Sequence, residues 1–315
     1  MPPTEEPPHE QATWGVYRGT GHPGPGGEPW PDPPGRRSYG GGPLLPAPPD
    51  DPYAALLLGE GTSPLPFAPD EVDRVNAALC LRRPLLVSGE PGTGKASLAH
   101  RIGRELALGR VLHWRITSLS TLREGLFAGE GRLGPLGTAL LPYRRPRILL
   151  IDRLDRAEIS LPEDLCTVLA AGGFDLPAGA GRVATDDEPD AVVTVPGGVV
   201  RCHAFPVVVI TTTGERDMPF DLVRRCVVLR TRRPDSDTLR AVAARHYPPG
   251  RPGTPAPDVV DAFLERAERA EGPVVERLLD SLHLAANGVL SAVADERGWQ
   301  PAVDALWAWT APEEP

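Results

Sequence analysis

Residues 89–95 read Gly-Glu-Pro-Gly-Thr-Gly-Lys and have the spacing of a phosphate-binding loop. Glycines let the backbone turn tightly, so that successive N–H groups point inward at phosphate oxygens. Lys95 adds an ammonium group for the outer phosphates, and a helix starting there adds the positive end of its dipole. We therefore expect a nucleotide-binding site made of Gly89, Glu90, Pro91, Gly92, Thr93, Gly94, Lys95, Ala96 and Ser97.

One position in this stretch departs from the phosphate-loop pattern. The residue after the lysine is ordinarily Ser or Thr, whose hydroxyl binds Mg²⁺, but here it is Ala96. Ser97 follows one step later, and a shift of one residue turns a helical side chain by about 100°. We therefore expect nucleotide binding and treat hydrolysis as a separate question. The alternative is an accidental glycine-rich turn.

A second candidate is the carboxylate of Asp152, which ends the apolar run of residues 148–151. An aspartate at the carboxyl end of a buried strand is the Walker B arrangement, in which it holds Mg²⁺. The alternative is a plain strand that ends in a helix-capping aspartate. A hydrolysing enzyme would have glutamate next, but Arg153 stands there and cannot act as a base at neutral pH. Asp155 could compensate in part.

The elements that must position these residues alternate between apolar strands and amphipathic helices. Strands are predicted at 85–87, 110–117, 147–152, 206–213 and 227–230, and helices at 51–58, 70–81, 96–106, 118–127, 133–141, 161–171 and 220–225. Residues 191–195 and 199–205 flank Pro196-Gly197-Gly198 and predict a β-hairpin, preceded by a polar loop over 178–190.

The chain divides into three parts by composition. Residues 1–66 hold nearly half of the 39 prolines and few aliphatic residues, so we expect a largely disordered tail. Its aromatic residues are either docking anchors or scattered linker aromatics: Trp14, Tyr17, Trp30 and Tyr39. Residues 67–232 form the nucleotide-binding core. Residues 233–315 form a lid with helices at 235–247, 258–270, 274–290 and 301–309, in which we expect Trp299, Trp307 and Trp309 to pack in the core or at a subunit contact.

Composition narrows the class of protein further. With 315 residues, 41% of them hydrophobic, the chain can build one or two domains. A net charge of −9 makes nucleic acid an unfavoured partner. The four cysteines contain no CxxC pair, which favours free thiols in a reducing cytoplasm over zinc or disulfides. No apolar run is long enough to span a membrane, and the acidic start is unlike a signal peptide.

The order of motifs resembles the AAA+ superfamily of P-loop NTPases and, within it, the MoxR-like ATPases. The matching stretches are GEPGTGK from Gly89, LLIDRLD from Leu149, ITTTGER from Ile210 and DLVRRC from Asp221. The resemblance covers about residues 69–290. It implies an α/β fold with a five-stranded parallel sheet sandwiched by helices and a small helical lid. It further implies a ring, usually a hexamer, with ATP and Mg²⁺ between subunits and the predicted hairpin as a family insertion.

The resemblance also implies roles for single residues. Lys95 and the loop amides hold the phosphates, and Asp152 holds the metal. Thr213 matches the sensor-1 position, where Asn is usual. Arg225, with Arg224 beside it, matches the arginine finger that reaches a neighbour's nucleotide. Arg277 is a candidate for sensor 2, with a surface arginine as the alternative.

The departures from the family lie where the chemistry takes place: Ala96, Arg153 and Thr213. We therefore predict an ATP-binding, chaperone-like or regulatory assembly factor with slow or absent ATPase activity, acting on proteins such as those with von Willebrand A domains. An interaction scaffold with a vestigial nucleotide site is the alternative. A small-molecule kinase would need a phosphoacceptor pocket that the sequence does not indicate.

Overall fold

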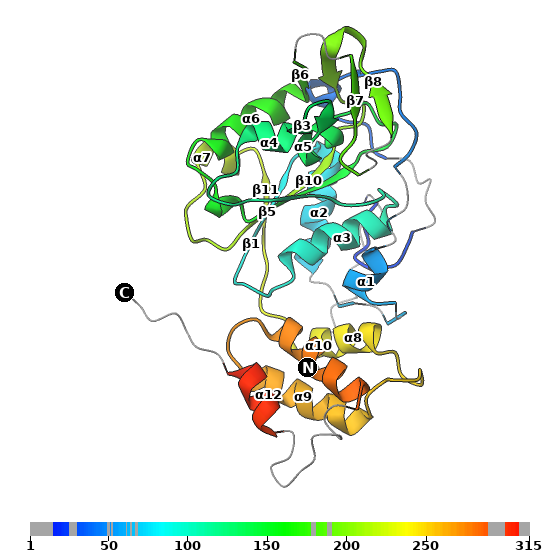
Figure 1. Ribbon diagram of the computed structural model, residues 1–315, viewed down its shortest axis with the longest axis vertical. Coiled ribbons are helices and arrows are strands. Elements are labelled where there is room, and N and C mark those ends of the chain that lie inside the picture. Colours follow the sequence, from blue (N-terminus) through cyan, green and yellow to red (C-terminus); the bar gives the residue numbers. More distant parts are fainter. Residues whose placement is uncertain are drawn as a thin grey trace, which may run out of the picture.

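A computed structural model describes residues 15–24, 30–48, 51, 53–60, 62–63, 65–66, 69–177, 181–187, 191–288 and 300–308. Its centre is a sheet of five parallel strands in the order β11-β1-β10-β5-β2 (Figure 1). These strands are β1 (Leu85–Ser88), β2 (Leu112–Arg115), β5 (Ile148–Asp152), β10 (Val207–Thr212) and β11 (Val227–Arg230). The predicted parallel α/β sheet is confirmed.

Helices cover both faces of this sheet, which explains why its strands are continuously apolar. Leu85 and Val87 of β1 face one way and pack with α2 (Pro69–Leu81) and α3 (Lys95–Glu105). Leu86 faces the other way, into a cluster built by the remaining core helices. These are α4 (Leu122–Leu126), α5 (Pro135–Ala139), α6 (Leu161–Ala171) and α7 (Phe220–Val223).

Two small sheets lie beside the core, and they correct the prediction of a hairpin around Pro196. One sheet has the order β3-β4-β7-β8 and the other pairs β6 with β9. The strands are β3 (Phe127–Gly129), β4 (Arg132–Leu133), β6 (Gly173–Asp175), β7 (Arg182–Ala184), β8 (Val192–Thr194) and β9 (Val199–Arg201). The two sides of the expected hairpin, β8 and β9, therefore belong to different sheets. A 3₁₀ turn, η3 (Pro196–Gly198), separates them, and each pairs with an earlier strand.

The lid is a separate cluster of helices with its own hydrophobic core (Figure 1). It consists of α8 (Ser236–His246), α9 (Pro257–Arg269), α10 (Val274–Ala286) and α12 (Gln300–Trp307). Phe263, Leu278 and Trp307 are buried in it, so Trp307 packs inside the lid as predicted. Trp299 and Trp309 lie outside the described residues.

The prediction of a disordered tail does not hold for the parts of residues 1–66 that the structure describes. Residues 15–24 and 30–48 pack against the core, and α1 (Ala54–Leu58) lies between α3 and α8. Tyr17 is 1% exposed, and the ring of Tyr39 stacks on Phe205 at 5.7 Å. Composition misled here because buried polar side chains of the core bind the segment's backbone, in addition to the packing of its few apolar residues such as Tyr17. Trp14 lies outside the described residues.

Two further 3₁₀ helices, η1 (Gly35–Arg37) and η2 (Leu154–Arg156), complete the described elements. Two other features bear on the class of protein. The four cysteines are all free thiols. Among the described residues, no helix combines the length and apolar character that crossing a bilayer requires.

Candidate nucleotide-binding site

The phosphate loop connects the carboxyl end of β1 to the first turn of α3, as the sequence predicts. Gly94 caps α3 with φ +77°, and Gly92 has φ +76°, a conformation that side chains with a Cβ rarely adopt. A Cβ on Gly92 would also come within 2.5 Å of Pro273 Cβ, at the start of lid helix α10. Glycine is therefore required here both by the turn and by the lid that packs on it.

Lys95 points back into this loop. Its side chain is buried at 8% exposure, and Nζ donates to the carbonyl oxygens of Gly89 (2.7 Å) and Glu90 (2.6 Å). Burial lowers its pKa from the ordinary value. The ammonium group is thus held at the mouth of the loop by neutral carbonyl groups, which leaves its charge available to an anion.

Lys95 is also the only lysine among the 33 lysine and arginine residues of the chain. Arginine supplies every other positive side chain apart from histidine. The single lysine therefore indicates that lysine and arginine are not interchangeable at position 95. A compact ammonium on a flexible stem fits inside a tight loop, whereas a planar guanidinium does not. This signal was present in the sequence and strengthens the assignment.

Thr231 supports the loop and was missed from the sequence. Its hydroxyl lies 2.7 Å from that of Thr93, and it donates to the carbonyl oxygen of Ser88 (3.2 Å). It follows β11, the neighbour of β1, so only the strand order reveals it. Ala96 has no hydroxyl and packs partly against the core cluster. Ser97, which has one, is exposed on α3.

Asp152 ends β5 at the carboxyl edge of the sheet, two strands from β1. Its Oδ1 accepts a 2.6 Å hydrogen bond from Thr211 Oγ1 on β10, and Oδ2 lies 3.5 Å from Nε2 of His113 on β2. The contact with His113, followed by the bond from Thr211, lowers the pKa of Asp152, so this carboxylate is ionised at neutral pH.

Thr211 is thus the threonine that contacts Asp152, and sequence reasoning missed it. Thr213 instead donates through both its N–H (2.9 Å) and its hydroxyl (2.7 Å) to Asp155 Oδ2. Three consecutive threonines made the sequence ambiguous, and the pairing of Ile210 with Ile151 decides which of them lies next to the strand end.

The described residues do not form a complete Mg²⁺ site. Ala96 has no oxygen to offer, and both oxygens of Asp152 already contact neighbouring side chains. No group of three or more His, Cys, Asp or Glu side chains in the described part of the chain is arranged to hold a metal ion. What the loop offers a nucleotide is therefore backbone amides and one ammonium group.

Arg153 adopts a left-handed conformation with φ +62°, and its backbone N–H donates to Thr211 Oγ1 (2.8 Å). Its guanidinium pairs with Glu215, which also lies 4.0 Å from Arg156. The side chain at the position of the expected base is thus a cation held by a carboxylate. It can neither accept a proton nor orient a water molecule as a glutamate would.

Asp155, which contacts the backbone of Glu215, is 2% exposed. Burial alone would raise its pKa, but hydrogen bonds from Thr213 and from the backbone N–H of Glu215 lower it below the ordinary value. Its Oδ2 is occupied by these donors, while Oδ1 has no hydrogen-bond partner among the described residues. Asp155 also lines an open polar pocket of about 450 Å³. The arrangement organises the loop after β10 through Asp155 Oδ2.

The two candidate finger arginines lie away from this chain's own loop. Arg224 is exposed and pairs with Asp221 at 2.6 Å, whereas Arg225 is half-buried. Both precede β11, and because Val227 pairs in parallel with Leu85, they lie at the amino edge of the sheet. The phosphate loop is at the carboxyl edge, a strand's length away. Arg225 therefore lies at the opposite edge of the sheet from the phosphate loop of its own chain.

Arg277 is at the start of α10, near Pro273, and its Nη1 donates to the carbonyl oxygen of Glu271 (3.0 Å). The structure thus places this sensor-2 candidate on the lid segment that packs on Gly92.

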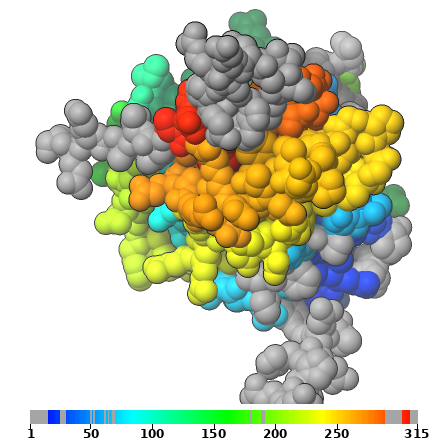
Figure 2. All heavy atoms as spheres, turned by 90° about the horizontal axis from the view of Figure 1, so that it is seen from below, coloured from blue at the N-terminus to red at the C-terminus, as the bar shows by residue number. Residues whose placement is uncertain are grey.

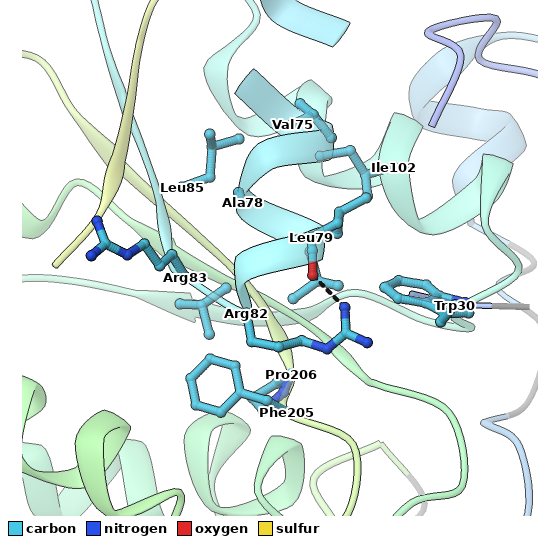
Figure 3. Close-up of a pocket in the computed structure, with 12 residues that line it drawn as sticks. Trp30, Val75, Ala78, Leu79, Arg82, Arg83, Leu85, Ile102, Phe205 and Pro206 are labelled. Atoms are coloured by element: carbon cyan, nitrogen blue, oxygen red, sulfur yellow. Dashed lines mark hydrogen bonds between the residues drawn. The ribbon is translucent and has the colours of Figure 1, made fainter. Parts of the chain in front are cut away.

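A second cavity, at the amino edge of the sheet, is too small to hold a nucleotide. It lies among apolar side chains of α2, β1 and the residues before β10, with the guanidinium of Arg82 and the ring of Trp30 at its rim (Figure 3). Its volume of about 10 Å³ corresponds to about one water molecule. The carboxyl edge is therefore the better candidate for the site.

No family model matches the chain. The subunit RuvB of the Holliday junction branch migration complex from Anaeromyxobacter sp. (strain Fw109-5) is 40% identical over 97 residues, which are 31% of this chain and 25% of RuvB. The chain thus matches about a quarter of the length of these curated relatives. Among solved structures, the Holliday junction branch migration motor RuvB of Thermotoga maritima gives a TM-score of 0.42 at 18% identity, covering 71% of this chain and 60% of that one.

The Saccharomyces cerevisiae Hsp104:casein complex in its extended conformation gives a TM-score of 0.46 at 13% identity, covering 76% of this chain and 48% of that one. The argument for the fold comes from the chain itself, because the sheet has five parallel strands and the phosphate loop follows β1. The chain has an α/β fold in which a phosphate loop joins the first strand of a five-stranded parallel sheet to a helix.

Proposed function

We propose that this chain is a MoxR-like AAA+ protein that binds ATP and works in the cytoplasm as a chaperone-like or regulatory assembly factor, with slow or absent hydrolysis. The observation that carries the proposal is the loop between β1 and α3. It presents the chain's only lysine, buried and bound to neutral carbonyl groups, to the position where a triphosphate would lie. The amides at the start of α3 add the positive end of a helix dipole.

The reduced hydrolysis follows from the second half of the site. Asp152 is ionised and contacts Thr211 and His113, so its carboxylate is not free to take a proton. Arg153, where a base is expected, is paired with Glu215. Loss of a general base costs about 10²–10⁴ in rate. ATP would therefore act mainly as a structural ligand that fixes one conformation.

The test uses the fact that the chain has one lysine. The intact protein is acylated with an amine-specific reagent with and without ATP, and ATP affinity is measured in parallel by calorimetry. ATP at ten times its Kd should slow acylation of Lys95 by about tenfold, because only the free fraction reacts. The α-amino group of the recombinant chain serves as the internal reference. Absence of both a binding heat and protection of Lys95 would reject the proposal.

We further propose that the chain works in a ring, homo-oligomeric or shared with a more complete paralogue, and a hexamer is the expected form. The position of Arg225 supports this, because the residue lies at the opposite edge of the sheet from its own chain's phosphate loop. Protein clients with von Willebrand A domains are the expected partners. Light scattering with and without ATP tests assembly, and Arg225→Ala should weaken the ATP-dependent part of it.

Two alternatives have distinct tests. An interaction scaffold with a vestigial site would show no thermal shift with ATP, since a ligand that binds only the folded state raises its stability. A DNA-remodelling role is suggested by the 97-residue match to RuvB, although the net charge of −9 disfavours it. Binding to a four-way DNA junction at 50 and 200 mM salt would separate it from the proposed function.

A further inference from the structure

Residues 15–24, here called the strap, are held on the core by buried polar side chains. Asn76 on α2 accepts from the N–H of Tyr17 (2.9 Å) and donates to its carbonyl oxygen (2.7 Å). Glu105, the last residue of α3, accepts from the N–H of Arg18, from Thr20 Oγ1 (3.0 Å) and from the N–H of Gly21 (3.1 Å). These side chains therefore bind one defined backbone path.

The strap is consequently part of the folded core. Asn76 is 3% exposed and Glu105 is 6% exposed. A buried carboxylate without hydrogen-bond donors is strongly unfavourable, and here the strap supplies the hydrogen-bond donors. Detaching the strap would remove these three donors from Glu105.

The lid contacts the same strap through Arg245, near the end of α8. This side chain is fully buried, and among the described residues no carboxylate is one of its hydrogen-bond partners. Its guanidinium donates to the carbonyl oxygens of Leu58 (2.9 Å), Ser63 (3.0 Å) and Gly21 (3.3 Å). Gly59 packs so closely on Arg245 that a Cβ there would lie 2.6 Å from its backbone. Arg245 is thus a clasp that joins the lid to the strap.

The lid touches the core at a second place, where Pro273 lies on Gly92 of the phosphate loop. Gly92 precedes the first residue of α3, and the strap is bound at its last residue, Glu105. The two contacts are therefore separated by the length of an 11-residue helix, about 16 Å. Figure 2 shows the lid side of the molecule, with the lid in yellow and orange and earlier segments in blue beside it.

We propose that the Arg245 clasp couples the phosphate loop to the strap: nucleotide in the loop fixes the lid on the core, and the lid holds the strap in place. The inference rests on the proposed nucleotide binding and extends it with a regulatory output. The strap becomes a segment whose order reports whether the site is filled. A ligand that favours the closed lid must also make the strap detach less often, if the strap can detach only when the lid moves.

Hydrogen exchange of the full chain, measured by mass spectrometry with and without ATP, tests the coupling. In the wild-type protein, ATP at ten times its Kd should slow exchange of peptides covering residues 15–24 by about tenfold. In Arg245→Gln, ATP should slow the same peptides less than about twofold while its calorimetric Kd stays within about threefold. Arg240→Gln is the matched control, since Arg240 lies on the same helix but pairs with exposed Asp261 (2.6 Å). It should behave as wild type.

The wild-type measurement alone can overturn the inference. If calorimetry shows that ATP binds while strap exchange is unchanged, the coupling is absent and the proposed function stands. If ATP does not bind, the proposed function fails and the coupling fails with it. Should Arg245→Gln not fold, Arg245→Lys takes its place, because an ammonium keeps the charge but cannot span three separated carbonyl oxygens. It should lose at least half of the ATP effect on the strap.

Discussion

The carboxyl edge of the sheet has two halves, the end of β1 and the ends of β5 and β10. They differ in the partners that their charged side chains contact. At the end of β1, the hydrogen bonds of Lys95 to described residues go to neutral carbonyl oxygens, so its charge is ready for an anion. At the ends of β5 and β10, Asp152 contacts Thr211 and His113, and Arg153 is paired with Glu215. One half is prepared to hold a phosphate, and the other has its reactive groups occupied. Binding and cleavage are thus separable properties of a single site.

The largest expected effect is at Lys95. Lys95→Ala and Lys95→Arg should each weaken ATP binding by about 100-fold. Alanine removes charge-assisted bonds worth about 1.5–3 kcal/mol. Arginine should fail because its planar fork does not fit the loop that Lys95 fills. Calorimetry on both variants measures this. If Lys95→Arg binds ATP as tightly as the wild type does, the loop is not shaped for lysine in particular, and this part of the comparison is wrong.

The second prediction concerns Asp155, in the half formed by the ends of β5 and β10. Asp155→Ala leaves the donors of Thr213 and Glu215 without an acceptor and should lower the free energy of unfolding by about 2 kcal/mol at pH 7. Because its pKa is lowered in the folded state, its stabilisation is complete above the unfolded value near 3.9 and is lost as pH falls through the folded pKa. The gap between wild type and variant in urea unfolding should therefore shrink below about pH 4.

Asp164→Ala is the control for this prediction, because Asp164 is an exposed residue in the first turn of α6. It should cost at most about 1 kcal/mol, the value of a charge near a helix end. A gap at Asp155 that stays constant down to pH 3 would mean that its ionisation is not linked to folding.

A smaller change should restore cleavage. The double variant Ala96→Ser with Arg153→Glu should raise ATP turnover by about tenfold, because a carboxylate again stands beside Asp152. The control combines Ala96→Ser with Arg156→Glu, which alters the other arginine near Glu215 and should leave turnover unchanged. Steady-state phosphate release measures both. Ordinary ATPase rates in the unaltered protein would show that Arg153 does not block the reaction.

The smallest effect concerns Mg²⁺. Since Ala96 offers no hydroxyl and Asp152 is already engaged, adding Mg²⁺ should change the Kd for ATP by less than about fivefold. Ala96→Ser should increase that dependence. Calorimetry in Mg²⁺ and in EDTA provides the comparison. A strong Mg²⁺ requirement in the unaltered protein would contradict the conclusion that the described residues do not form a complete Mg²⁺ site.

Local features of the chain were predictable because their physics is local. The seven residues of the phosphate loop make their turn with their own glycines, and β1 and β5 are apolar because helices cover both faces. Asp152 could be placed at a strand end for the same reason. The sites that stay proposals, Arg224 and Arg225 above all, depend on a second chain that no local pattern describes.

What the sequence by itself determined is the loop around Lys95 and the strands and helices that carry it. Tertiary structure alone decided that Thr211 lies beside Asp152, that β8 and β9 join different sheets, and that a proline-rich segment is folded. In each case the deciding contact joins distant positions, such as Tyr17 with Asn76, 59 residues apart. Composition measures how much apolar surface a segment can bury. It does not show the buried Asn76 and Glu105 elsewhere in the chain that bind its backbone.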